Sequence, residues 1–324
     1  MRTPLTDPTG PLVVVQRLLN AVLDDVWGAG LNVVADLTGV ELLASPFMQR
    51  AYLAAVCIAF IGPVVGSLLV HREMAMIGDT LAHSAFAGVA AGLFVNAAFA
   101  VTVPPLLTAL VVAAVAALLV QTLVDYAGTY RDTSLAIVLT GSFAVGSVLV
   151  TATDGGIAVG INAYLFGSLA TVSRANAAIL LASSGVVGVV AAAYRPLLYV
   201  TFDTVGARAA GLDVERYNRM LAVLTAVVVV AAMQIMGVIL VAAMLVIPVA
   251  TTTVVTGFKR ALVAAVVAGQ FATVTGVTLS YLYDVAAGGA VVLVAIAGYA
   301  AVAVAVRVRR RIALHRREAP RREP

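Results

Sequence analysis

Long apolar runs separated by short polar segments make up most of the chain. No charged residue occurs within 134–153, 220–257 or 261–283. An apolar run of about 20 residues forms a helix long enough to cross a hydrocarbon core about 30 Å thick. A membrane β-barrel would instead need short strands of alternating polarity, a pattern that this sequence does not display. The chain is therefore predicted to be an all-α integral membrane protein.

Polar residues divide the apolar runs into about nine predicted transmembrane passes. The passes lie near 51–70, 80–99, 104–124, 134–152, 176–194, 218–234, 236–256, 261–282 and 287–306. The sixth and seventh are short and are separated only by "MQIMG" at 233–237, so one broken helix is the alternative. The predicted fold is a polytopic bundle of about eight to nine transmembrane helices.

The basic residues predict the orientation of the bundle, because cytoplasmic loops of membrane proteins carry an excess of lysine and arginine. With nine passes and an internal C-terminus, sixteen of the 20 basic residues fall on the inner side. Eight passes would leave either the 195–219 loop or Lys259 and Arg260 outside. The distribution favours nine passes, an external N-terminus and a cytoplasmic C-terminus.

Composition agrees with a membrane protein. Of 324 residues, 62% are hydrophobic and 11% are charged, against roughly 25% charged in soluble domains. The net charge of +4 reflects eight arginines after Val306, in "RVRRRIALHRREAPRREP". Such a tail is typical of an anchor at an anionic membrane surface, and no folded basic domain accompanies it to favour nucleic-acid binding. The single cysteine, Cys57, excludes an intrachain disulfide framework.

Three regions follow from these patterns. We expect residues 1–46 to form an N-terminal extension with an amphipathic or surface helix, residues 47–306 to form the transmembrane domain, and residues 307–324 to form a basic cytoplasmic tail. No cleaved signal peptide is expected, because Arg17 and Asp24 interrupt the apolar stretch near the N-terminus.

Two loops stand out between the passes. The predicted outer loop 153–175 is polar and glycine-rich, but its "AYLFGSL" is apolar enough to dip back into the membrane. The inner loop begins with Arg195-Pro196, which is expected to end the preceding helix. Its "DTVGARAAGL" predicts a short helix with Asp203 or Thr204 as N-cap and Gly211 as C-terminal stop. This short helix is either a docking element or an ordinary connector.

No catalytic set is evident in the sequence. None of the three histidines lies in an HExxH pattern, and there is no GxSxG turn. The one lysine, Lys259, lies between Phe258 and Arg260, so a phosphate-binding loop with its GK[ST] motif cannot be formed. The chain is predicted not to be an enzyme, and any ATP hydrolysis must come from a partner subunit.

The candidate chemistry lies in "REMAMIGDTLAHSAFAGVAAGLF", at the start of the second pass. Asp79 and His83 share one helix face at i and i+4, where their Cβ atoms lie about 5 to 6 Å apart. A carboxylate and an imidazole suit zinc or manganese, and ionisable groups inside a membrane usually face a cavity or a partner. The alternative is structural, with Asp79 as a helix cap and His83 hydrogen-bonded within a packed core.

Small residues follow this pair at four-residue steps. Ser84, Gly88 and Gly92 form a seam that lets helices approach closely in membranes. If two copies met around an axis, two aspartates and two histidines would converge and supply the four ligands of a tetrahedral site.

Five segments, in order, resemble the membrane permeases of ABC importers for zinc, manganese and iron. They are "HREMAMIGDTLAHSAFAGVAAG", "YLFGSL", "YRPLLYVTFDTVGARAAGLDVERYNRM", "MQIMGVILVAAMLVIPVATT" and "YLYDVAAGGAVVLVA". The resemblance covers about Phe47 to Val306. Thr80 and Ala82 replace the alanine and serine usual in the first motif, and the last motif lacks the family's proline. The N-terminal extension and the arginine-rich tail lie outside the resemblance.

The resemblance implies a homodimeric or pseudo-dimeric helical permease of the type II ABC importer kind, in a prokaryotic plasma membrane. It further implies cytoplasmic ABC ATPase subunits that use ATP, an extracytoplasmic metal-binding protein, and no permanently bound cofactor. Asp79 and His83 become the expected ion pathway. The residues expected to couple the permease to the ATPase are Asp203, Arg208, Ala209, Gly211, Leu212 and Arg216.

Two other transporter classes remain as alternatives. An ABC permease for a metal chelate, of the siderophore or cobalamin type, would need a wide and mostly neutral path. An ion-driven secondary transporter would need no ATPase. Aspartate and histidine accept zinc, manganese and iron alike, so the ligands leave the choice of ion open.

Overall fold

The computed structural model describes residues 26–39, 41–99, 101–126, 130–152, 164–167, 179–181 and 183–318. The predicted parts outside these ranges are residues 1–25 of the extension, most of the 153–175 loop with the beginning of the fifth pass, and the last residues of the tail. Within the described ranges every regular element is a helix. The elements are α2 (Ala29–Thr38), the short 3-10 helix η2 (Glu41–Ala44), α3 (Pro46–His71), α4 (Ile77–Phe99), α5 (Pro105–Tyr126), α6 (Arg131–Thr151), α9 (Gly185–Ala192), α10 (Tyr194–Phe202), α11 (Thr204–Ala209), α12 (Val214–Thr251), α13 (Phe258–Tyr283) and α14 (Ala287–Glu318).

The number of helices able to cross a membrane agrees with the lower predicted count. Seven described segments are long and apolar enough, and the bent pair Ile179–Ala192 and Tyr194–Phe202 makes eight. The all-α membrane fold is thereby confirmed. The seventh predicted pass, 236–256, corresponds to Met236–Thr251, which is shorter than the about 20 residues that a span needs.

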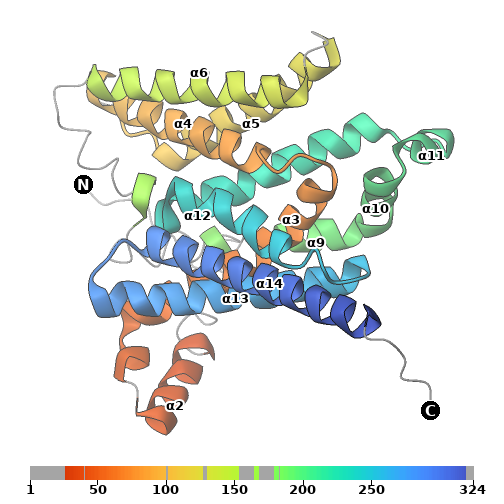
Figure 1. Cartoon of the computed structure of the whole chain (residues 1–324). Coiled ribbons are helices and arrows are strands. Elements are labelled where there is room, and N and C mark those ends of the chain that lie inside the picture. Colours follow the sequence, from red (N-terminus) through yellow and green to blue (C-terminus); the bar gives the residue numbers. More distant parts are fainter. Residues whose placement is uncertain are drawn as a thin grey trace, which may run out of the picture.

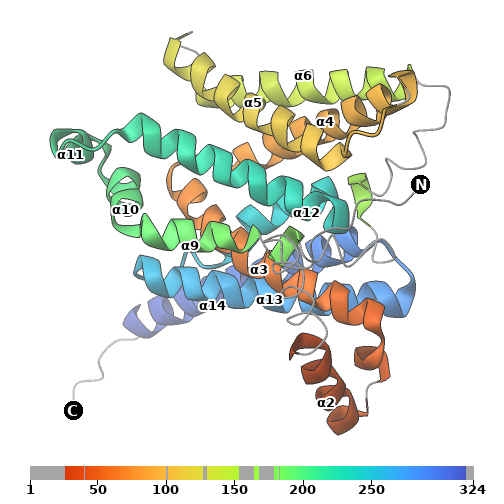
Figure 2. The same cartoon turned by 180° about the vertical axis from the view of Figure 1, so that it is seen from behind.

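The helices form three layers (Figures 1 and 2). The first layer holds α4, α5 and α6, the middle layer holds α3 and α12, and the third holds α13 and α14. In both views α12 doubles back on itself. Gly237 interrupts its helical backbone with φ 80° and ψ 159°, a conformation that essentially only glycine adopts.

Side-chain contacts support this reversal. Near the start of α12, Asn218 accepts a hydrogen bond from Arg72 at 2.7 Å. Shortly after the end of α12, Phe258 packs edge-on against His71, with ring centroids 5.5 Å apart. Since His71 and Arg72 are adjacent, both ends of α12 lie at the same end of the bundle. This explains why the sequence fits either two short passes or one broken helix.

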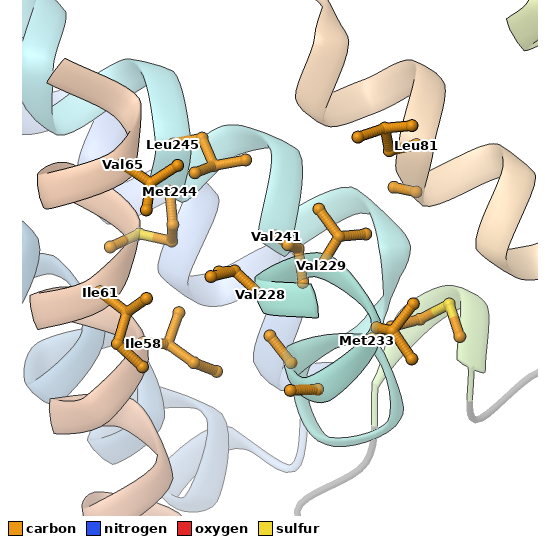
Figure 3. Close-up of a cluster of buried hydrophobic side chains, with 14 of the residues drawn as sticks. Ile58, Ile61, Val65, Leu81, Val228, Val229, Met233, Val241, Met244 and Leu245 are labelled. Carbon is orange, nitrogen blue, oxygen red and sulfur yellow. The ribbon is translucent and has the colours of Figure 1, made fainter. Parts of the chain in front are cut away.

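The core joins the middle layer to its neighbours (Figure 3). Side chains from α3, α4 and both halves of α12 meet there, and they include Ile58, Ile61, Val65, Leu81, Val228, Val229, Met233, Val241, Met244 and Leu245. Backbones also approach closely, because a Cβ placed on Gly66 would collide with the carbonyl of Leu245. Close packing at small residues drives helix association in membranes, where lipid is as apolar as the side chains.

Before the core helices, α2 is fastened to the beginning of α3. The indole Nε1 of Trp27 donates to the carbonyl of Gln49 at 2.7 Å, and the Gln49 amide donates to Asn32 at 2.6 Å. Val33 and Leu37 on α2 are 57% and 81% exposed. The described part of the N-terminal extension therefore presents apolar side chains outward while polar side chains attach it to the bundle.

Candidate metal-transfer site

Asp79 and His83 lie in the first two turns of α4, which begins at Ile77. The Oδ1 atom of Asp79 lies 3.5 Å from the Nε2 atom of His83. The His83 side chain is 24% exposed and that of Asp79 is 42% exposed. Both groups can therefore be reached from the surface of the single chain, and their donor atoms point toward one another.

The separation of these donor atoms suits one shared ion. Two ligands bound tetrahedrally, each about 2.0 to 2.2 Å from the ion, lie about 3.4 Å apart. The observed 3.5 Å is close to that value. Within the described part of the chain, no group of three or more His, Cys, Asp or Glu residues could hold a metal. Asp79 and His83 of one copy are therefore a candidate half-site with two ligands.

Aromatic rings of α4 and α6 hold the imidazole of His83. Phe143 packs edge-on against it, with ring centroids 5.4 Å apart, and Phe86 stacks on Phe143 at 5.9 Å. The Nδ1 atom of His83 is buried and has no hydrogen-bond partner among the described residues. Histidines in stable metal sites almost always donate the second ring N–H to an oxygen. Among the described residues, His83 has no such support.

The small-residue seam faces the two neighbouring helices. Ser84 lies 2.9 Å from the hydroxyl of Ser142 on α6 and donates to the carbonyl of Thr80 at 2.8 Å. A Cβ on Gly88 would lie 2.6 Å from the Cα of Ala109 on α5, and one on Gly92 would collide with Thr108. The seam therefore packs α4 against α5 and α6, while Asp79 and His83 remain partly exposed.

The predicted short helix of the inner loop is present as α11. Asp203 is its N-cap and accepts a hydrogen bond from the Gly206 N–H at 2.7 Å. Gly211 has φ +81°, and the Leu212 N–H donates to the carbonyl of Ala207, which closes the helix. Ala207 and Leu212 pack in a small cluster with Val200, Val214 and Tyr217.

The outward side of this loop carries the remaining residues of the predicted coupling set. Arg208, Ala209 and Arg216 are all exposed, and the Arg216 N–H donates to Asp213, which caps α12. The preceding helix breaks at Ala193, two residues before the expected Arg195-Pro196. Pro196 is accommodated in the first turn of α10, where its missing N–H removes no intrahelical hydrogen bond.

Arg72 links the α3–α4 turn to this loop, and sequence reasoning gave it no role. Its guanidinium donates to the Thr201 hydroxyl at 2.8 Å, to Asn218 at 2.7 Å and to the carbonyl of Leu197 at 3.2 Å. These partners lie on α10 and α12, on either side of α11. The one available signal was the position of Arg72 in the "HREM" segment just before Asp79.

The described residues 164–167 of the predicted outer loop lie at the opposite end of the bundle. A Cβ on Gly167 would collide with the backbone of Met236, beside the reversal in α12. A Cβ on Gly288, at the start of α14, would lie 2.7 Å from the Met236 carbonyl and 2.9 Å from that of Phe166. Three segments that are distant in sequence thus touch through their backbones.

Comparisons with known proteins cover the same elements. The ABC 3 transport family matches residues 44–306. The manganese transport system membrane protein MntC of Halalkalibacterium halodurans is 33% identical over 259 residues, covering 79% of this chain and 86% of that protein. A probable metal transport system membrane protein of Treponema pallidum is 34% identical over 257 residues, covering 79% and 94%. The high-affinity zinc uptake system membrane protein ZnuB of Haemophilus influenzae is 28% identical over 247 residues, covering 75% and 91%.

A solved structure shares the fold as well. PsaBC from Streptococcus pneumoniae, solved in complex with Fab, matches with a TM-score of 0.72 and 26% identity over 83% of this chain and 95% of that chain. The family match extends from the end of η2 into α14. It therefore contains α4, the short helix α11 and the reversal in α12.

Proposed function

Because the chain belongs to the ABC 3 transport family, we propose that it forms the ion pathway of an ATP-driven importer of divalent transition-metal ions. The family match confirms the resemblance to metal ABC permeases. The observation that carries the proposal is the Asp79–His83 pair, whose donor atoms are spaced for one shared ion on a partly exposed face of α4.

We further propose that two copies of the chain place this face toward one another. Each copy offers two ligands, so a pair of copies would offer the four of a tetrahedral site. The half-site is open to a partner because both side chains are partly exposed. The ion is cargo rather than a resident cofactor, and weak binding at each copy permits release.

Manganese and zinc are the cargoes that we propose first, with iron as the third. Two relatives are named for manganese and zinc transport. Both ions accept carboxylate and imidazole ligands. The order of metal affinities alone does not determine which ion is transported in a cell. The transported ion is therefore to be identified by an uptake measurement.

The proposed transport requires further subunits that hydrolyse ATP and deliver the ion. We propose cytoplasmic ABC ATPase subunits as the energy source, because Lys259 cannot form a phosphate-binding loop. The exposed helix α11, with Asp203, Arg208, Ala209, Gly211, Leu212 and Arg216 in and around it, is the proposed coupling element. An extracytoplasmic metal-binding protein would deliver the ion to the opposite end of the bundle.

The proposed cycle is alternating access. ATP-driven closure of the ATPase subunits moves α11, and Arg72 carries that movement to the turn before α4 through its bonds to α10 and α12. The pair lies within the first two turns of α4, at the end that carries Arg72. The position of the pair near this end of α4 supports a role as a gate close to the side where the ion is released.

The chain is a multi-pass protein of the membrane. We propose the bacterial plasma membrane as its location, with the end that carries Arg72, Arg131 and Lys259 in the cytoplasm. The regions 1–46, 47–306 and 307–324 remain our proposed division into extension, transmembrane domain and cytoplasmic tail.

Metal accumulation tests the proposal. Cells without their own manganese, zinc and iron importers would express the chain with its ATPase and binding protein. We expect uptake of at least one of the three ions, and loss of that uptake when the ATPase carries an inactive phosphate-binding loop. Uptake that persists without the ATPase would instead indicate a secondary transporter, and uptake of a chelate alone would indicate the chelate class.

A further inference from the structure

Helices α13 and α14 lie on the side of the bundle opposite α4 and α6 (Figures 1 and 2). An apolar groove with a volume of about 860 Å³ runs between them and the second half of α12. Val263, Val267 and Phe271 of α13 lie along it at four-residue spacing, each between 61% and 63% exposed. The small residues Ala268 and Gly298 leave the space between the helices open.

Two basic residues close one end of this groove. Lys259 and Arg260 line it at the first turn of α13, and both are exposed. In the described part of the chain, neither forms an ion pair with a carboxylate. The Lys259 ammonium lies 5.9 Å from the centre of the Tyr194 ring. An adjoining hollow of about 500 Å³ is lined by the same two residues together with Thr256, Gly257 and Phe258.

The backbone at this end also favours an anion. The Ala261 N–H makes the hydrogen bond that opens α13, to the Gly257 carbonyl at 3.0 Å. Because Gly257 provides no side-chain cap, the preceding N–H groups of the first turn remain available to another acceptor. The positive end of the helix dipole adds to the charges of Lys259 and Arg260.

The length of the groove matches one lipid leaflet. From Lys259 to Phe271, α13 rises about 18 Å at about 1.5 Å per residue. Half of a hydrocarbon core about 30 Å thick is about 15 Å. A chain lying along the apolar stripe would therefore reach from the headgroup level to near the midplane of the bilayer.

We propose that this groove binds one anionic phospholipid, with its phosphate at Lys259 and Arg260 and an acyl chain along Val263, Val267 and Phe271. Basic pockets between transmembrane helices commonly bind anionic headgroups. A second copy of the chain is the less suitable occupant, because symmetric contact would bring the exposed basic pairs of both copies together. The cytoplasmic leaflet follows from the orientation proposed above, whereas the binding itself depends neither on that orientation nor on transport.

Lipid titration of the purified full chain tests this assignment. Native mass spectrometry in detergent would follow binding of the first phosphatidylglycerol, with phosphatidylcholine as the uncharged comparison. We expect the double variant Lys259→Gln with Arg260→Gln to bind phosphatidylglycerol about 30-fold more weakly. The matched control, Arg307→Gln with Arg309→Gln, removes the same charge from exposed positions of α14 that do not line the groove. Equal affinity in the two double variants would overturn the proposal.

A steric variant tests the contribution of the groove independently of the charges of Lys259 and Arg260. Ala268→Leu fills the floor of the groove and keeps both basic residues, so it is expected to weaken binding as well. Val274→Leu, at an exposed position of α13 outside the groove, is expected to leave binding unchanged. Thermal unfolding in lipid-free detergent shows whether each variant is folded.

A cross-linking experiment distinguishes a lipid from a second copy. With Cys57 replaced by alanine, Val267→Cys would provide a single cysteine inside the groove. Under oxidation in native membranes we expect no disulfide-linked dimer through Val267→Cys. Efficient disulfide-linked dimers would show that another copy occupies the groove and would contradict the proposal.

Discussion

At the residue scale, the guanidinium of Arg72 connects three hydrogen-bond acceptors at the bundle end near α11. It donates to Thr201, Asn218 and the carbonyl of Leu197. Burial, helped by nearby Arg131, lowers the pKa of Arg72 to about 10, so the group remains charged at neutral pH. Hydrogen bonds of charged groups contribute about 1.5 to 3 kcal/mol each, and an acceptor left without a partner costs a similar amount. Movement of α10 should therefore displace the turn that precedes α4.

Replacing Arg72 tests this connection. Arg72→Gln is expected to lower metal uptake in proteoliposomes by about tenfold or more, because its contacts to α10 and α12 are lost together. ATP hydrolysis by the partner subunits should persist, because the substitution leaves the ATPase itself unchanged. Hydrolysis would then no longer drive transport. Arg219→Gln is the matched control, because Arg219 is exposed and its side chain donates to the Glu215 carbonyl within α12. Wild-type uptake by Arg72→Gln would refute the connection.

At the element scale, the reversal of α12 organises the middle layer. Gly237 has a positive φ, and its Cα lies against the backbone of the 164–167 segment. A Cβ at this position would lie 2.5 Å from the Gly167 nitrogen and 2.6 Å from the Leu165 carbonyl oxygen. Both the backbone conformation and the contact therefore require glycine at position 237.

Gly237→Ala should therefore destabilise the bundle. A residue forced into such a conformation costs about 1 to 3 kcal/mol before any clash is counted. We expect a lower midpoint of thermal unfolding in detergent. Gly188→Ala is the control, because a Cβ there meets nothing within 4 Å inside α9, and alanine favours a helix. Equal midpoints for the two variants would contradict the reversal.

Much of the helical arrangement could be predicted from the sequence, because a span needs only length and apolar composition. The predicted 80–99 and 261–282 correspond closely to α4 and α13. The spacing of Asp79 and His83 likewise follows from helical geometry alone. A reversal at 233–237 was one of the two interpretations that the sequence allowed. The contact between Gly237 and Gly167 could not be predicted, since the two residues are far apart in the chain. The partners of Arg72 are also distant in sequence, and no local pattern identifies them.

At the scale of the whole molecule, basic residues gather at one end of the bundle. The Arg131 guanidinium donates to the Arg72 carbonyl at 3.3 Å, and Lys259 lies over the ring of Tyr194, which begins α10. The exposed Arg208 and Arg216 flank α11 at the same end. Clustered positive charge is typical of the cytoplasmic side, where ATPase subunits would bind.

Cysteine labelling tests this orientation. In a Cys57→Ala background, Asp284→Cys places a thiol at the turn between α13 and α14, and Arg311→Cys places one at the other end of α14. A membrane-impermeant maleimide should label Asp284→Cys in intact cells and Arg311→Cys only in inverted vesicles. The reverse pattern would show that the bundle is inserted the other way.

The most direct test of the whole account is metal uptake by Asp79→Asn, a variant that keeps the size of the side chain and removes its charge. The chain would be expressed with its ATPase and binding protein in cells without other importers, and accumulation of manganese and zinc would be measured. We expect a loss of at least about tenfold, with normal uptake by the control Asp132→Asn, an exposed carboxylate in the first turn of α6. Unchanged uptake by Asp79→Asn would contradict the assignment of this pair as the ion pathway.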